Sequence, residues 1–408
     1  MLDYEKIINQ CELVIKNQTT RNINSYHGLR DYTFFLSSLI KVTPNLYELI
    51  EEKIIRNTNS IDEYVEGIIT SPGLWHGLSS YGYLCAELND NKNLQYSYEK
   101  KNQKLSNMVE LLSKNIGEIK IKSLQQIRNH KWFDIFYGVT GIIVYLFRVE
   151  RFESAKKLIY MLTDSILLTE FLDVYNSPFS EKIEAYFPGK FDRNSGNIIN
   201  LDVSHGILSV FFVIKEAHII FPNDQRIFDA YTCIRNFYVS IFNVKNSSYH
   251  KQITDYSDIR ISKFKSNWAR GDLPLIIQLL SVKDPLFDIS DNRDYLKKNI
   301  NDRLLKEQDD MNFNFCNGIA GVNFQLKIIN QYFYLNYFEK CVDEKIINGL
   351  DQKIDKEIDE KEDQRLVFKT INDMNIIDGS FSIIVPKILS NHYSDLTQTF
   401  IAKMFCIK

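Results

Sequence analysis

The chain is poor in the residues that interrupt helices, with only 8 prolines and 16 glycines among 408 residues. A chain of this length built from many short strands needs turn residues at frequent intervals, so their scarcity favours long helices. An excess of either charge is also missing, since 49 lysines and arginines stand against 52 aspartates and glutamates. Proteins that bind nucleic acid usually carry a basic surface, and we therefore expect no nucleic-acid partner.

Patterned cysteines and long apolar runs are absent as well. The six cysteines include no CxxC pair and no regular spacing, which indicates reduced thiols rather than a disulfide framework. The most apolar stretch, GILSVFFVIKEAHIIF, is broken by charges before it reaches the ~20 residues of a membrane helix. The start, MLDYEKIINQCELVIKNQ, carries acids and lacks the apolar core of a signal peptide. We therefore expect a soluble, cytoplasmic protein without a membrane span.

One short pattern recurs along the chain, namely Gly-x-x-small followed by apolar residues. It occurs at Gly77, Gly138, Gly206, Gly271, Gly318 and Gly379, with a weaker instance at Gly28. Successive intervals run from 47 residues (Gly271 to Gly318) to 68 residues (Gly138 to Gly206). Self-similarity at such a period indicates a repeat architecture, and each interval has room for two helices and their loops.

The apolar residues after each glycine are nearly continuous, as in helices buried on all sides. The segments between them are amphipathic; Leu105, Met108, Leu111 and Leu112, for example, follow one another at helical spacing. This alternation predicts an all-α fold, an α/α toroid with a double ring of six or seven inner and outer helices. No linker divides the chain, so we expect one domain over residues 1–408, with N-terminal helices in 1–60 and repeats over about 60–390.

In such a ring the loops before the inner helices gather at one end, and their residues would share a cavity. These residues are His76, Asp134, His205, Arg270, Cys316, Asn317 and Asp378. A histidine before a glycine can also simply cap a helix or bond a loop carbonyl. A carboxylate and an imidazole at the same loop face, as with Asp134 and His205, favour a functional site, because both groups titrate and point into one pocket.

The repeats resemble the lanthionine synthetase C (lanthipeptide cyclase) family over roughly residues 60 to 390. WFDIFYGVTGI is similar to the family's aspartate-containing motif and DVSHGILS to its His-Gly motif, which implies catalytic roles for Asp134 and His205. The resemblance implies a toroid that adds a peptide cysteine to dehydroalanine or dehydrobutyrine, forming a thioether ring. It also implies a precursor peptide, with leader and dehydrated core, as the partner, and a dehydratase and an exporter as further candidates.

The family's zinc motifs match poorly. The stretch KSNWARG places Ala269 where the family has a ligand cysteine and Arg270 where it has a tyrosine, and CNG keeps Cys316 but has Asn317 in place of a ligand histidine. Alanine offers no donor and an amide is a poor zinc ligand, so we expect no metal and no other cofactor. A substitute site from Asp134, His205 and Cys316 is less favoured, because it would consume both catalytic groups.

Without zinc the thiol must ionise by other means. An ordinary thiol with a pKa of about 8.5 is only ~3% ionised at pH 7, which costs roughly 2 kcal/mol. Arg270 and Lys265 flank the lost ligand position and could favour the thiolate, although Lys265 could equally be a solvated loop residue and Arg270 a salt-bridge partner. His205 would protonate the enolate, because imidazole titrates near the working pH, and Asp134 would orient its ring.

Four further residues are candidates for substrate contact: Cys316, Asn317, His76 and Trp268. Cys316 could equally be an inert buried thiol. Two functions remain open, a metal-independent cyclase and a non-catalytic peptide-binding or scaffold protein of a lanthipeptide biosynthetic complex. A third and weaker alternative, a glycan hydrolase on an α/α barrel, would pair Asp134 with Asp272 or Asp378 across the cavity.

Overall fold

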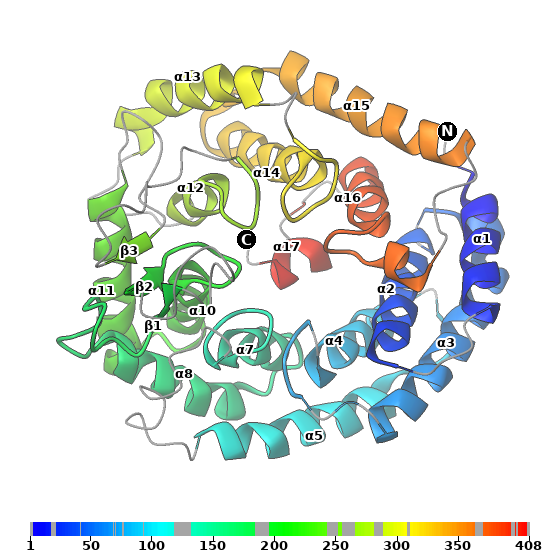
Figure 1. Ribbon diagram of the computed structural model, residues 1–408, viewed down its shortest axis with the longest axis horizontal. Helices are drawn as coiled ribbons and strands as arrows, with labels where there is room; N and C mark the ends of the chain where they lie inside the picture. The colour runs from blue at the N-terminus through cyan, green and yellow to red at the C-terminus, as the bar shows by residue number, and fades with distance from the viewer. Residues whose placement is uncertain are drawn as a thin grey trace.

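The computed structural model describes residues 3–17, 22–40, 42–67, 69, 71–75, 77–92, 94–117, 132–183, 196–242, 252–254, 266–280, 289–307, 311–363, 370–392, 396 and 399–405. Within these residues, seven outer helices surround seven inner helices, and outer and inner helices alternate along the chain (Figure 1). The outer ring consists of α1 (Tyr4–Lys16), α3 (Tyr47–Gly67), α5 (Glu99–Gly117), α8 (Phe152–Ile166), α11 (Gln225–Ile241), α13 (Ile289–Glu307) and α15 (Glu344–Asp363). The inner ring consists of α2 (Ile23–Leu39), α4 (Leu78–Asn89), α7 (Val139–Arg148), α10 (Ile207–Ile220), α12 (Leu273–Leu280), α14 (Ile319–Tyr337) and α16 (Phe381–His392).

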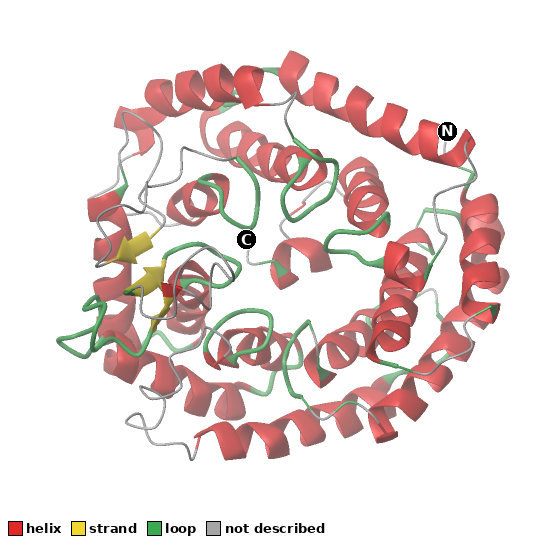
Figure 2. Cartoon of the chain, in the orientation of Figure 1, coloured by secondary structure: helices red, strands yellow, loops and turns green. Residues whose placement is uncertain are grey.

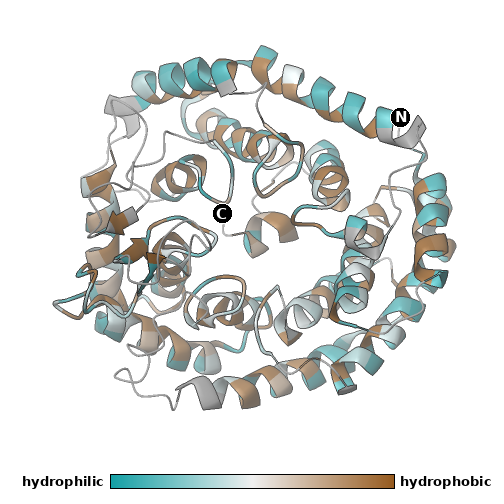
Figure 3. Cartoon of the chain, viewed as in Figure 1, coloured by the Kyte–Doolittle hydropathy of each residue, from teal (hydrophilic) through white to brown (hydrophobic). Residues whose placement is uncertain are grey.

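The two rings differ in composition as the sequence predicts. In α10 every residue from Ile207 to Lys215 is buried, because neighbours cover the helix on all sides. Outer helices such as α15 are amphipathic, and Figure 3 shows polar residues recurring along the outer ring while apolar residues dominate the inner one. The predicted all-α toroid is confirmed. In the described part of the chain, no helix combines the length and apolarity that a membrane span requires.

Four of the repeat glycines, Gly77, Gly138, Gly206 and Gly318, are the N-caps of inner helices, and Gly271 and Gly379 lie two residues before α12 and α16 begin. Gly138 and Gly206 have φ of −94° and −117°, which any residue can adopt, so a left-handed backbone is not the reason for glycine. The reason is space: a Cβ would lie 2.5 Å from the backbone nitrogen of Asp134 at Gly138, and 2.5 Å from that of Asp202 at Gly206. The loop before each helix therefore folds back tightly onto its glycine.

A buried ion pair closes the ring. Arg30 and Asp31 of α2 have side chains only 1% and 0% exposed, and Arg30 Nε donates to Asp31 Oδ1 at 2.6 Å. Arg30 also donates to the carbonyl of Trp75, before α4, at 2.6 Å, while Asp31 Oδ2 accepts from the backbone N–H of Ile376, before α16, at 3.2 Å. The first inner helix is thereby joined to the second and to the last.

The middle of the inner ring holds a short C-terminal helix, α17 (Phe400–Met404), as Figure 1 shows. Thr399 caps this helix by accepting from the backbone N–H of Ala402 at 3.3 Å. The ring of Phe400 stacks on Phe34 of α2, with centroids 4.8 Å apart. Lys403 lines a cavity of ≈370 Å³ next to residues near the C-terminal ends of α7 and α10.

A small antiparallel sheet interrupts the helical pattern (Figure 2). It pairs β1 (Ser180–Lys182) with β2 (Asn197–Asn200), and β2 with β3 (Gln252–Thr254), so that Ser180 lies opposite Ile199 and Ile199 opposite Ile253. The sequence analysis did not predict these strands. Strand β2 runs directly into the loop that carries His205, so the sheet anchors one side of that loop.

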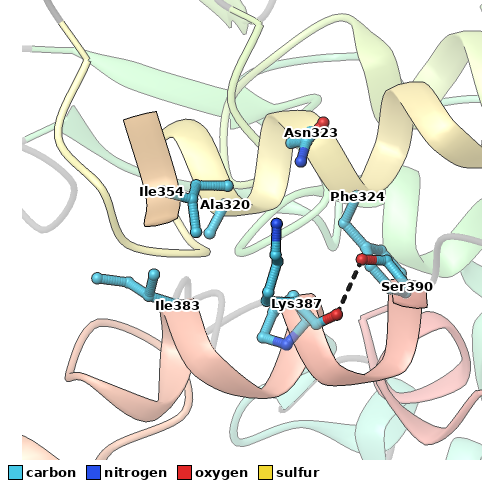
Figure 4. A pocket seen from close by; sticks show the side chains of 8 residues that line it. Ala320, Asn323, Phe324, Ile354, Ile383, Lys387 and Ser390 are labelled. Carbon is cyan, nitrogen blue, oxygen red and sulfur yellow. Dashed lines mark hydrogen bonds between the residues drawn. The ribbon is translucent and has the colours of Figure 1, made fainter. Parts of the chain in front are cut away.

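A cluster of charged side chains joins α14, α15 and α16, on the side of the ring away from the sheet (Figure 1). Asp351 of α15 accepts from Lys327 and Asn323 of α14, both at 2.9 Å, and from Lys387 of α16 at 3.2 Å. Burial alone would raise the pKa of the Asp351 carboxyl, but Lys327, Lys387 and Asn323 together hold it below its usual value. Figure 4 shows Lys387 pointing towards Asn323 beside a cavity of ≈10 Å³, which has room for one water molecule.

Candidate active site

His205 and Asp134 form a hydrogen-bonded pair in the loops that lead into α10 and α7. His205 Nδ1 lies 2.8 Å from Asp134 Oδ2, and the side chain of Asp134 is fully buried while that of His205 is 29% exposed. The other carboxylate oxygen accepts from the backbone N–H groups of Tyr137 and Gly138, at 2.7 and 3.0 Å, and so fixes the loop that leads into α7. With Nδ1 turned to the carboxylate, Nε2 is the ring nitrogen placed to exchange a proton with a substrate.

Asp202 and Phe136 hold His205 from two further sides. Asp202 Oδ1 accepts from the backbone N–H of His205 at 3.1 Å and from the Ser204 hydroxyl at 3.2 Å. The backbone N–H of Asp202 donates in turn to Asn200 Oδ1 of β2 at 3.0 Å. The ring of Phe136 lies against the imidazole, with centroids 5.0 Å apart and planes tilted by 31°. The imidazole therefore has a fixed position before any substrate arrives.

Sequence analysis missed Asp202, although a signal for it exists. An Asp or Asn stands four residues before each of five repeat glycines, at Asp134, Asp202, Asn267, Asn314 and Asn375. In the first four loops its side-chain oxygen accepts from the backbone N–H three residues further on, at 2.7 to 3.1 Å. In the last loop Asn375 accepts instead from Ile377, two residues on, at 2.7 Å. These short polar side chains shape each loop before its glycine.

The other half of the site consists of the loops around Ala269 and Cys316. The backbone N–H of Ala269 donates to the carbonyl of Cys316 at 2.9 Å, and that of Cys316 donates to Ile377 at 3.2 Å, so three loops lie side by side. Burial, and then the charges of Asp378 and Asp202, raise the pKa of the Cys316 thiol to about 12, while Arg270 partly offsets them. Cys316 is therefore a neutral thiol at physiological pH. Because Asp202 lies in the His205 loop, its effect on the Cys316 pKa also shows that the charges of that loop act on the Cys316 loop.

The residues at the family's zinc positions do not fit that metal. They offer the methyl group of Ala269, the thiol of Cys316 and the exposed carboxamide of Asn317, whereas zinc requires three donors from Cys, His or carboxylate in a catalytic site. Among the residues that the structure describes, no group of three or more His, Cys, Asp or Glu side chains gathers as a metal site would require.

The remaining candidate site residues differ in exposure and position. Arg270 and Asn317 are exposed on the loops beside Cys316, where a peptide can reach them. Trp268 is fully buried and donates its Nε1–H to the carbonyl of Phe405 at 2.8 Å, so its ring is packed inside and does not fit a direct substrate contact. His76 and Lys265 lie outside the described residues, and their roles stay predictions.

A double ring of helices, with an Asp–His pair in the loops at the N-terminal ends of the inner helices, defines an α/α toroid with a candidate site at one end. The chain belongs to the lanthionine synthetase C-like protein family, whose model matches residues 19–371. The solved structure of nisin cyclase is similar at a TM-score of 0.64 and 15% sequence identity, covering 99% of this chain and 96% of that chain. At this identity the likeness establishes the fold. No curated protein sequence gives a significant match.

Proposed function

We propose that the protein is a lanthipeptide cyclase that works without zinc. It would add the cysteine thiol of a precursor peptide to dehydroalanine or dehydrobutyrine, forming lanthionine or methyllanthionine. The observation that carries this proposal is the 2.8 Å contact between His205 Nδ1 and Asp134 Oδ2, in which a buried carboxylate orients a partly exposed imidazole. A protein that only holds a peptide needs no such pair.

The reaction needs no reactant beyond the peptide itself. His205 Nε2 accepts the thiol proton, and the sulfur attacks the β-carbon of the dehydro residue. As the C–S bond forms, the electron pair of the C=C bond moves towards the neighbouring carbonyl and gives an enolate. The imidazolium then returns the proton to the α-carbon, so no atom is lost or gained. Asp134 stabilises the imidazolium while it carries that proton.

Arg270 is the proposed cation of the site. Its charge favours the anionic form of the nearby Cys316 thiol, so its field reaches the space between the loops. The same field would favour a substrate thiolate and the developing enolate oxygen. Lys265 is a second candidate for this role. Cys316, with its raised pKa, is not the nucleophile; together with Asn317 and His76 it would contact the peptide.

The alternative function is a non-catalytic peptide-binding or scaffold protein of a lanthipeptide biosynthetic complex. It is favoured by the loss of zinc donors at Ala269 and Asn317. In both cases the partner is a precursor peptide with a leader and a dehydrated core, in the cytoplasm, and a dehydratase and an exporter are further candidate partners.

The test is cyclisation of a dehydrated, cysteine-containing precursor peptide, followed by thiol alkylation and mass spectrometry, with and without a chelator. We expect slow thioether formation that the chelator does not change, and its loss in His205→Ala. The matched control is His218→Ala, because His218 lies near the C-terminal end of α10, the helix that follows the His205 loop, and is stacked on Tyr231 at 4.9 Å. Peptide binding without any thioether in the parent protein would overturn the cyclase and leave the scaffold.

A further inference from the structure

The loops of the active site share one aromatic cluster beneath them. This aromatic hub consists of Trp75, Phe136, Trp268, Phe315 and Phe405, each at most 7% exposed. Trp268 directly precedes Ala269, Phe315 directly precedes Cys316, and Phe136 follows Asp134 by two residues. Each of these loops therefore carries a candidate site residue within two positions of an aromatic ring of the hub.

Phe405 is the member of the hub that comes from the C-terminal segment. Its ring centroid lies 4.7 Å from Trp75, 4.7 Å from Trp268 and 4.4 Å from Phe315. Its carbonyl also accepts the Nε1–H of Trp268 at 2.8 Å, the hydrogen bond that satisfies this buried donor. One residue that follows α17 thus contacts aromatic side chains from three different loops.

The hub extends to the imidazole through Phe136. The Phe136 ring lies 6.0 Å from Trp75 and 6.1 Å from Trp268, and it packs against His205 at 5.0 Å. Protein interiors are close-packed, so a change in volume at Phe405 must be absorbed by shifts of its neighbours. The neighbours here are the anchors of the loops that carry Asp134, Ala269 and Cys316.

We propose that Phe405 is a positioning residue, which sets the distance between the Asp134–His205 half of the active site and the Ala269–Cys316 half. It is fully buried and acts only through Trp75, Trp268 and Phe315, so it does not touch the substrate. The consequence for catalysis rests on the proposed cyclase function, whereas the structural link from Phe405 to Cys316 does not.

The chain offers a matched control in α17, the short helix that Phe405 follows. Phe400 is also buried, at 4% exposed, but it stacks on Phe34 of α2 rather than on the hub. We expect Phe405→Leu to lower kcat about tenfold or more with a much smaller change in KM, because misplacement of about 1 Å can cost ~100-fold in rate. Phe400→Leu should lose similar thermal stability and keep kcat within about twofold of the parent. Equal kcat in the two variants would overturn the proposal.

A second readout does not depend on activity. Labelling of Cys316 in the folded protein, resolved by peptide mapping, should become at least severalfold faster in Phe405→Leu and stay at the parental rate in Phe400→Leu. If the parent forms no thioether, the cyclase proposal fails, yet this labelling still decides the role of Phe405. If Phe405→Leu does not fold, Trp268→Phe removes the hydrogen bond to Phe405 together with part of the ring packing, and should accelerate the same labelling. A parental labelling rate in the folded hub variant would contradict the proposal.

Discussion

The loops at 134–138 and 202–206 and the loops at 267–271 and 314–318 are constructed alike, yet they present different chemistry. In all four an Asp or Asn accepts from the backbone three residues on, and a glycine follows one residue later. The first two loops use aspartate and the last two use asparagine. Because asparagine shapes the loop as well as aspartate does, the negative charge of Asp134 is not needed for the fold.

The carboxylates of Asp134 and Asp202 differ in what they contact besides the loop backbone. Asp134 Oδ1 accepts from the backbone of its own loop and Oδ2 lies 2.8 Å from the imidazole of His205. Asp202 Oδ1 accepts from the backbone N–H of His205 and from the Ser204 hydroxyl. In Asp134, a residue that shapes its loop thus also contacts an imidazole. The other two loops have the same backbone hydrogen bond and carry Ala269 and Asn317, which offer no ligand that zinc prefers.

The largest effect is expected for Asp134→Asn. The amide oxygen can still accept from the loop N–H groups of Tyr137 and Gly138, so the thermal midpoint should change little, but the imidazole loses its carboxylate partner. We expect cyclisation to fall by about 10³-fold, in the range of lost general acid–base catalysis. The matched control is Asp202→Asn, which keeps the loop and should stay within about threefold of the parent. Equal losses in the two variants would show that Asp134 is only a loop residue.

A gain is expected from restoring the missing ligands with Ala269→Cys and Asn317→His. Their two loops are already joined by the Ala269–Cys316 backbone hydrogen bond at 2.9 Å, so the donors would lie together. Elemental analysis should find about one zinc per chain. Thiol activation should then raise the cyclisation rate by about thirtyfold, corresponding to the roughly 2 kcal/mol of unassisted ionisation. Each single variant is the control, and a double variant without zinc would show that the loops are too far apart.

A smaller effect is expected for Arg270→Gln. Loss of the cation should slow cyclisation about tenfold at pH 7 and displace the rate profile towards higher pH, because the thiolate loses a favourable charge. The measurement is the initial rate from pH 6 to 9 at low and high salt. Arg270→Lys should keep most of the parental rate. An unchanged pH profile in Arg270→Gln would show that Arg270 takes no part in the reaction.

The smallest effect on activity is expected for Cys316→Ser, within about twofold, because a thiol with a pKa near 12 is protonated at neutral pH. In the folded parent, Cys316 should resist alkylation at pH 8. A faster reaction than that of an unfolded control would contradict the raised pKa.

The same thiols predict how stability depends on pH. Burial raises the pKa values of Cys85 and Cys341 to about 12, as it does for Cys316. The unfolded chain releases these protons above about pH 8.5 and the folded chain keeps them, so the free energy of unfolding should fall as pH rises from about 9 towards 12. Urea midpoints between pH 7 and 10.5 measure this fall, and Cys85→Ala should reduce it.

The glycine pattern predicted most of the inner ring because each repeat glycine marks the point where a loop folds back at a helix start. It was weak at Gly28, which lies inside α2 rather than at its cap. The small sheet escaped prediction because β1, β2 and β3 are short and pair residues from Ser180 to Thr254 that are far apart in sequence. That residues 1–408 form a single domain stays a prediction.

The site was predicted as far as its residues lie in repeated loops. Asp134 and His205 were expected to meet, and they do. Trp268 was expected to contact the substrate, but its ring is fully buried and its Nε1–H is bonded to the carbonyl of Phe405. Phe405 carried no signal, since it lies outside the repeats and acts only through contacts formed after the whole ring has folded.

The Arg30–Asp31 pair also has a topological consequence. An open array of repeats can lengthen or shorten by whole repeats, because each unit contacts only its neighbours. In this protein Asp31 of the first inner helix, α2, accepts a hydrogen bond from Ile376, in the loop before the last inner helix, α16. An added or deleted helix pair would separate these two residues and break the bond. The number of repeats is therefore fixed, and with it the circumference of the ring on which the loops of His205 and Arg270 lie.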